Sequence, residues 1–213
     1  MSKLWEDTIL DRIVEKTIKN LEKHHFEVFY FEDLEKLKEK VKDYLKIYDS
    51  FSFGGSTTLV QTKLKDLIIE NGKKYIERIA GDDEEKKIES ERAALLSDIY
   101  FMSTNAVSST GALINIDKRG NRIGALIFGP KKVVVIASTN KITKDIDSGI
   151  ERAKNIAAVS NCKRFNLHTP CVNLQRCVDC EHEENICYTT VITKRSFPHK
   201  RIAVLLFEGN YGF

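Results

Sequence analysis

The sequence lacks the features of secreted, membrane-spanning and fibrous proteins. Residues 1–10 contain Glu6 and Asp7 and no apolar run of the length found in a secretory signal. No segment approaches the roughly 18 consecutive apolar residues of a membrane helix. Only three prolines are present among 213 residues, and 42% of the residues are hydrophobic, which is typical of an ordered protein with a sizeable core. We therefore expect a cytoplasmic protein with no membrane partner.

The chain also lacks a large excess of positive or negative charge. The chain has 34 basic and 31 acidic residues, mixed along its length, for a formal net charge of +3. Such a balance produces no large single-sign field, and the sequence gives little support to nucleic-acid binding. No nucleic-acid partner is expected.

Cysteine is absent from the first 161 residues, and all five cysteines lie between Cys162 and Cys187. Disulfides explain such clustering poorly in a chain without a signal peptide. Two residues separate Cys177 from Cys180, and Cys171 and Cys187 flank this pair, a spacing that suits structural zinc or an iron–sulfur cluster. The predicted metal ligands are Cys171, Cys177, Cys180 and Cys187, for which Cys162, His168 and His182 are possible substitutes. Buried free thiols or a redox-active Cys177–Cys180 pair are the alternatives.

Helical and strand patterns alternate along the chain. Helical periodicity at 4–23 precedes an aromatic, β-branched run at 26–31, and Asp33 is a candidate helix cap. A short strand at 49–53 enters a glycine loop, and the apolar spacing from Leu59 to Ile68 predicts a helix after it. Further strands are predicted at 99–102, 112–116, 125–128, 132–137, 188–193 and 202–207, with a helix at 144–159. This alternation predicts an α/β fold with a mostly parallel sheet covered on both faces.

A loop of two glycines and three hydroxyl residues follows the strand at 49–53. Its residues, Gly54, Gly55, Ser56, Thr57 and Thr58, allow close backbone approach, and a helix start offers free N–H groups to an anion. The loop matches neither a Walker phosphate loop nor a dinucleotide fingerprint. It predicts a site for a phosphate, a carboxylate or a diphosphate; a tight turn with Ser56 as helix cap is the alternative.

Two later segments offer further ligand contacts. The polar stretch from Ser103 to Gly111 follows a predicted strand, and Asp98, Asn105 and Asn115 are polar candidates in or beside it. Arg122 and Lys141 each follow an asparagine in a predicted turn and suit contacts with a carboxylate or phosphate. Lys131 and Lys132 are expected to be solvated surface charges.

These motifs, in this order, resemble the LUD domain family, which includes the small component of bacterial lactate-utilisation operons. The resemblance covers nearly the whole chain. It is carried by FGGSTTL at 53–59, STNAV at 103–107, GALINID at 111–117, GNR at 120–122, FGPKKV at 128–133, NKI at 140–142, RAKNIA at 152–157, TPC at 169–171, CVDC at 177–180 and GNYGF at 209–213.

The resemblance implies one Rossmann-like domain over 1–213, of the ribose-5-phosphate isomerase and CoA-transferase superfamily, with a cysteine-rich metal-binding insertion at 162–187. It also implies a component of L-lactate oxidation to pyruvate that works with iron–sulfur partner proteins, as a possible subunit of an oxidoreductase complex. The ligand would be a small organic anion or a phosphorylated compound.

One departure from the family pattern bears on catalysis. Ser109-Thr110-Gly111 stands where relatives usually place an acidic residue before the glycine, so a carboxylate nucleophile of the transferase kind has no obvious position. Asp98 and Asp117 remain as nearby carboxylates for general acid–base chemistry. An isomerase or transferase acting on a phosphorylated or CoA-linked substrate, and a non-catalytic subunit that docks a partner, remain the alternatives.

Overall fold

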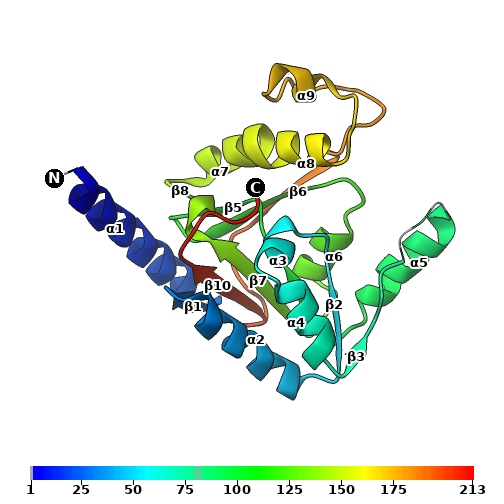
Figure 1. Cartoon of the computed structure of the whole chain (residues 1–213), viewed down its shortest axis with the longest axis horizontal. Coiled ribbons are helices and arrows are strands. Elements are labelled where there is room, and N and C mark those ends of the chain that lie inside the picture. The colour runs from blue at the N-terminus through cyan, green and yellow to red at the C-terminus, as the bar shows by residue number, and fades with distance from the viewer. Residues whose placement is uncertain (1, 80, 82) are drawn as a thin grey trace.

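The computed structural model describes residues 2–79, 81 and 83–213, so Met1, Ala80 and Asp82 of the predicted domain lie outside the described residues. Helices and strands alternate along most of the chain (Figure 1). In chain order the elements are α1 (Ser2–Lys23), β1 (Glu27–Phe31), α2 (Leu34–Ile47), β2 (Ser50–Phe53), α3 (Thr57–Gln61), α4 (Leu64–Asn71), β3 (Lys74–Tyr75), α5 (Glu84–Ala94), β4 (Ile99–Met102), β5 (Ala106–Ser108), β6 (Ala112–Asp117), α6 (Asn121–Ile127), β7 (Lys132–Ser138), η1 (Thr139–Lys141), β8 (Ile142–Thr143), α7 (Ile146–Arg152), η2 (Ala153–Ala158), α8 (Val159–Arg164), α9 (Pro170–Leu174), β9 (Thr189–Thr193) and β10 (Ile202–Phe207).

The larger sheet has six strands in the order β1-β10-β7-β4-β2-β3, and all neighbouring strands are parallel. Strands β7 and β10 are buried along their whole length, as expected for continuous runs of Val, Ile and Leu in the middle of a parallel sheet. The predicted α/β fold with a parallel sheet is confirmed. Because the strands are parallel, the loops after β2, β4 and β7 all leave the sheet at one edge.

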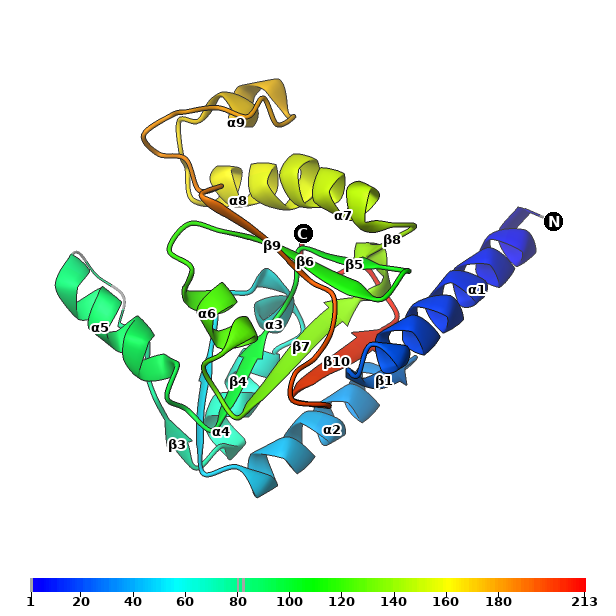
Figure 2. The same ribbon diagram turned by 180° about the vertical axis from the view of Figure 1, so that it is seen from behind.

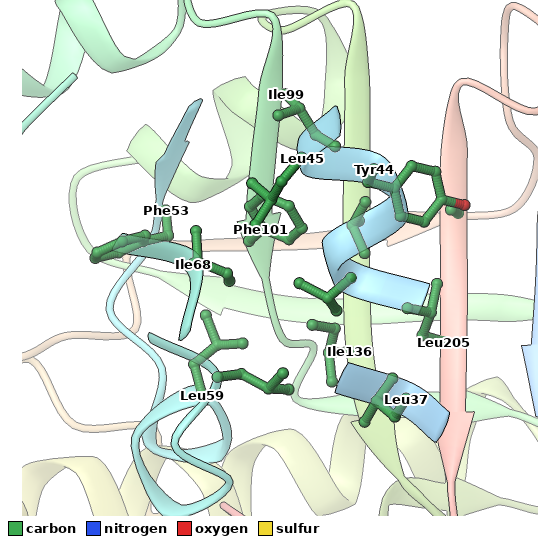
Figure 3. Packing of buried hydrophobic residues seen from close by; sticks show 14 of the residues in the cluster. Leu37, Tyr44, Leu45, Phe53, Leu59, Ile68, Ile99, Phe101, Ile136 and Leu205 are labelled. Atoms are coloured by element: carbon green, nitrogen blue, oxygen red, sulfur yellow. The ribbon is translucent and has the colours of Figure 1, made fainter. Parts of the chain in front are cut away.

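Helices cover both faces of this sheet. Helices α2, α3 and α4 pack on one face, where Leu37, Leu59 and Ile68 meet strand residues such as Phe101 and Leu205 (Figure 3). The other face is covered by α1, α5, α6 and part of a second sheet, through Leu21, Ala94, Leu126, Val107 and Leu113. None of the helices in the described residues is both long and apolar enough to cross a bilayer.

A second sheet of four strands, in the order β8-β5-β6-β9, was not predicted. Its strand β5 has three residues and lies within the polar stretch 103–111, where periodicity gives almost no signal. One face of this sheet packs against η2, through Ile114, Ile116 and Ala153. Figure 2 shows α7, η2 and α8 as one continuous helical stretch above this sheet, with α9 beyond it.

Two predictions of secondary structure are wrong. Residues 125–128 are not a strand, because helix α6 (Asn121–Ile127) occupies this segment and buries Ile123 and Leu126, three positions apart. The apolar spacing from Leu59 to Ile68 is not one helix, because Lys63 adopts a left-handed backbone (φ 58°) that separates α3 from α4.

Lys132 is not a surface charge, contrary to expectation. It is 7% exposed, and its ammonium donates to the carboxylate of Glu27 and to the main-chain oxygen of Lys200. Lys131 is exposed as expected and pairs with Asp98 (Nζ–Oδ1 2.7 Å). Lys131 precedes β7, whereas Lys132 is the first residue of this fully buried strand.

Candidate functional site

The glycine loop lies where β2 meets α3, at the carboxyl edge of the parallel sheet. The Gly54 amide donates to the Phe101 carbonyl (3.1 Å), which extends the pairing of β2 with β4. A Cβ atom at Gly54 would lie 2.8 Å from Cγ of Arg122, so only glycine lets this arginine pack against the loop. Gly55 is exposed, with nothing within 4 Å of the position of a Cβ atom.

The helix after the loop offers fewer free amides than expected. Helix α3 has only five residues, and the Ser56 hydroxyl already accepts a hydrogen bond from the Leu59 amide (3.2 Å). A Cβ atom at Gly212 would lie 2.2 Å from the Thr58 hydroxyl, so the C-terminal segment covers Thr58. Ser56 therefore caps α3, and the anion site at the loop stays a prediction. Gly55, Ser56 and Thr57 remain at the surface of the site.

Lys141 reaches the same place from η1, after the carboxyl end of β7. Its ammonium donates to the hydroxyls of Thr58 (2.9 Å) and Ser103 (3.0 Å) and to the Thr104 carbonyl (3.2 Å). No carboxylate in the described residues lies within 4 Å of this buried cation. Burial, followed by repulsion from Arg152 and Arg122, lowers the pKa of Lys141 to about 7.

Arg122 lies at the start of α6 and spans the loop and the second sheet. Its guanidinium donates to the Ile116 carbonyl (Nη2–O 2.7 Å), and its Nε lies 3.2 Å from Oδ2 of Asp117. Both side chains are largely buried, with 18% and 8% of their surface exposed. Asp117 thus neutralises Arg122 in part and holds it against the glycine loop.

A cleft of about 590 Å³ opens beside the loop. Two carboxylates, Glu91 and Asp117, line it, against six basic side chains, which are Arg78, Lys87, Lys118, Arg119, Arg122 and Arg164. A smaller hollow of about 30 Å³ adjoins it and is lined by Ser56, Thr57, Thr58 and Lys141. Several residues, among them Gly55 and Arg122, line both spaces. The excess of positive charge makes the cleft suited to an anion.

Sequence reasoning missed Arg164 and Asn161, which lie on α8 and line both spaces. The Arg164 guanidinium donates a hydrogen bond to Oδ1 of Asn161 (Nη2–Oδ1 2.9 Å) and lies 4.1 Å from the ring centre of Phe165. Burial and then the charge of Arg122 lower the pKa of Arg164. In sequence, Lys163-Arg164 is an ordinary basic helix end, and only the fold of α8 over the second sheet brings Arg164 to the cleft.

The other polar candidates have different positions. Asn105 lines the cleft, but its Oδ1 accepts from the Ile116 amide (2.8 Å), so it also braces β6. Asn115 is fully buried, and neither polar atom of its amide has a hydrogen-bond partner. Asp98 precedes β4 at the opposite edge of the sheet, where Ser50 and Lys131 hold it. Hydrogen bonds from Lys131 and Ser50 lower the pKa of Asp98 to about 2, and this carboxylate does not reach the cleft.

The structure brings all five cysteines around a second hollow of about 170 Å³. Cys162 and Cys171 are buried, and Cys177, Cys180 and Cys187 are partly exposed. His168 and His182 do not line this hollow. Within the described ranges, no three His, Cys, Asp or Glu side chains converge as the ligands of a single metal ion do. The four predicted cysteine ligands therefore lie together, and metal binding by them stays a prediction.

Comparisons with known proteins agree with this architecture. The family model of the LUD domain, a domain associated with lactate utilisation, matches residues 14–207. A crystal structure of a DUF162 family protein from Deinococcus radiodurans is similar over 94% of this chain and 98% of that chain, with a TM-score of 0.55 and 13% sequence identity. No curated protein matches the sequence. The chain belongs to the LUD domain family.

Proposed function

We propose that this protein is a lactate-utilisation component that binds a small carboxylate or phosphate-bearing anion in the cleft beside Gly55. The observation that carries the proposal is the charge of the lining, where six basic side chains meet two carboxylates. An anion placed between Arg122 and Arg164 would relieve the repulsion between these two guanidinium groups. L-lactate and pyruvate are the carboxylates that the family association favours.

The loop supports this proposal in a limited way. Gly55 lets a ligand approach the main chain, and the hydroxyls of Ser56 and Thr57 add donors at the rim of the smaller hollow. Lys141 lies beneath them and supplies positive charge from the interior when it is protonated. Together these groups would bind a carboxylate or phosphate through both fixed charge and neutral donors.

Calorimetric titration with L-lactate, pyruvate, sulfate and phosphate tests the proposal. We expect saturable binding of at least one anion, and much weaker binding by an Arg164→Gln variant. Lys131→Gln is the matched control, because Lys131 is an exposed basic residue at the opposite edge of the sheet. Absence of binding to the wild-type protein, or equal loss in both variants, would refute a specific anion site.

A second candidate function follows from Asp117. This carboxylate lines the cleft and lies beside Arg122, so it has access to a proton of a bound substrate. It would serve as the general base or acid of an isomerase or transferase that acts on a phosphorylated or CoA-linked compound. Turnover of such a compound by the wild type, lost in Asp117→Asn, would support this candidate; equal turnover in both would exclude Asp117 from the chemistry.

A further inference from the structure

The cysteine hollow is lined by sulfur from several separate elements. Cys162 comes from α8 and Cys171 from α9, while Cys177, Cys180 and Cys187 lie in the segment that leads to β9. The only carboxylate in its lining belongs to Asp179, and this group is held by Lys154 (Oδ1–Nζ 2.6 Å). The hollow therefore offers thiols as its main ligands, and thiolates select zinc, copper(I) and iron–sulfur clusters.

Hydrogen bonds of two asparagine side chains hold the cysteine segment. Oδ1 of Asn155, on η2, accepts from the Cys177 amide (2.8 Å). Asn185 accepts from the Cys187 amide and donates to the Cys180 carbonyl, both at 2.6 Å. The loop is thus tied to η2 at one end and closed on itself at the other.

The Cys177–Cys180 turn has the form of a sulfur-binding loop. Asp179 adopts a left-handed backbone (φ 45°), and its amide lies 3.5 Å from the Cys177 sulfur in a hydrogen bond. Amide hydrogen bonds to cysteine sulfur stabilise the thiolate and help to set the reduction potential of iron–sulfur clusters. This turn directs Cys177 and Cys180 to the same hollow.

The size of the hollow and the number of its thiols favour a cluster over a single ion. Zinc binds sulfur at about 2.3 Å, so all four of its thiolates lie within about 4.6 Å of one another. In the described residues no three cysteines converge in this way, although all five border one space of about 170 Å³. The iron atoms of a cluster occupy separate corners, and their thiolates surround the whole cluster instead of one point.

The hollow also shares a wall with the anion cleft. Ile116, on β6, and Ala158, at the end of η2, line both spaces. A ligand in the cleft and a metal centre in the hollow would therefore lie on two sides of a wall to which these apolar side chains belong. Charges on the two sides of a partly buried wall interact more strongly than charges in water, because the effective dielectric constant between them is lower.

We infer that the hollow holds an iron–sulfur cluster through Cys171, Cys177, Cys180 and Cys187, placed so that its reduction potential responds to an anion bound in the adjoining cleft. The first half of this inference stands on the cysteines alone, and the second half rests on the proposed function. Cys162 and Cys171 share one buried apolar cluster, and Cys162 is the more deeply buried of the two (2% against 8% exposed), so we assign it no role as a ligand.

Anaerobic purification from iron-supplied cells tests the cluster. We expect a coloured protein with iron and acid-labile sulfide in equal amounts, and loss of both in Cys177→Ala and Cys180→Ala. Cys162→Ala is the matched control and should keep its iron. Circular dichroism shows whether each variant is folded. Bound zinc without sulfide, or a folded wild-type protein that takes up no iron on reconstitution, would overturn the cluster; loss of iron in Cys162→Ala would overturn the assignment of the four ligands.

A redox titration of the same protein tests the coupling. Sulfate or L-lactate, compared with chloride at equal ionic strength, should lower the midpoint potential, because an added negative charge disfavours the reduced cluster. A tenfold weaker affinity of the reduced protein for the anion corresponds to about 59 mV for a one-electron couple. Arg164→Gln should abolish the shift and keep the iron. An unchanged potential in a wild type that binds the anion refutes the coupling, whereas a cluster-bearing wild type that binds no anion refutes the proposed function and leaves the cluster intact.

Discussion

Binding of an anion above pH 7 should be accompanied by uptake of a proton at Lys141. This lysine is 2% exposed, and its three donors contact neutral oxygen atoms of Thr58, Ser103 and Thr104. Burial and nearby arginines lower its pKa from 10.5 to about 7, so the amine is mostly neutral at pH 8. A negative charge in the cleft favours the ammonium form and raises this pKa again.

The size of the effect follows from the two pKa values. A group with a pKa of about 7 is about one-tenth protonated at pH 8, and full recovery of the ordinary lysine pKa would take up about nine-tenths of a proton per anion.

The lowered pKa of Lys141 also makes the stability of the fold depend on pH. Because the folded pKa is the lower one, the unfolded chain binds more protons, and this group makes stability rise between about pH 7 and 10.5.

Calorimetry in two buffers of different ionisation enthalpy measures the uptake directly. L-lactate and sulfate are suitable ligands, because neither titrates near pH 8. We expect the observed heat to depend on the buffer at pH 8, much less at pH 6, and not at all in Lys141→Met. Buffer-independent heat at pH 8 in a wild-type protein that binds the anion would show that Lys141 is not coupled to the site.

Other variants test the anion site and two buried polar groups. Arg164→Gln should weaken anion binding by about 10–100-fold, because this is the loss in affinity that corresponds to the free energy of one hydrogen bond to a charged group. Lys131→Gln should leave the affinity unchanged in the same titration. Asn115→Leu should raise the free energy of unfolding in urea by about 1–3 kcal/mol, because it removes a buried amide that lacks partners; a decrease would contradict this. Lys132→Met should lower that free energy by about 3 kcal/mol, because Glu27 loses its buried cation, and the double variant with Glu27→Gln should recover at least half of the loss.

The parallel sheet was predictable because its signals are local. The uninterrupted Val-Val-Val-Ile run of β7 and the strand–glycine–helix order at 49–68 depend only on neighbouring residues. Helix α6 was mistaken for a strand because a short segment of small and apolar residues between glycines carries little periodicity. The second sheet was missed because β5 is three residues long and β6 pairs with β9, more than seventy residues later.

The candidate site was predictable only in part, for a related reason. Arg122 and Lys141 follow strands or turns at the carboxyl edge. Because open α/β sheets bind ligands at this edge, the position of these two residues in the sequence was enough to predict them as ligand contacts. Arg164 and Asn161 reach the cleft from α8, which continues η2, and η2 packs on the second sheet. The cysteine spacing identified the four thiols, but no sequence pattern indicated that Ile116 and Ala158 line both their hollow and the cleft.

A crystal structure of the protein grown with L-lactate tests the central claim most directly. We expect the carboxylate in the cleft beside Gly55, within hydrogen-bonding distance of Arg122 or Arg164. An ordered cleft that holds only water at saturating L-lactate, sulfate and phosphate, with any bound anion located elsewhere, would contradict the account.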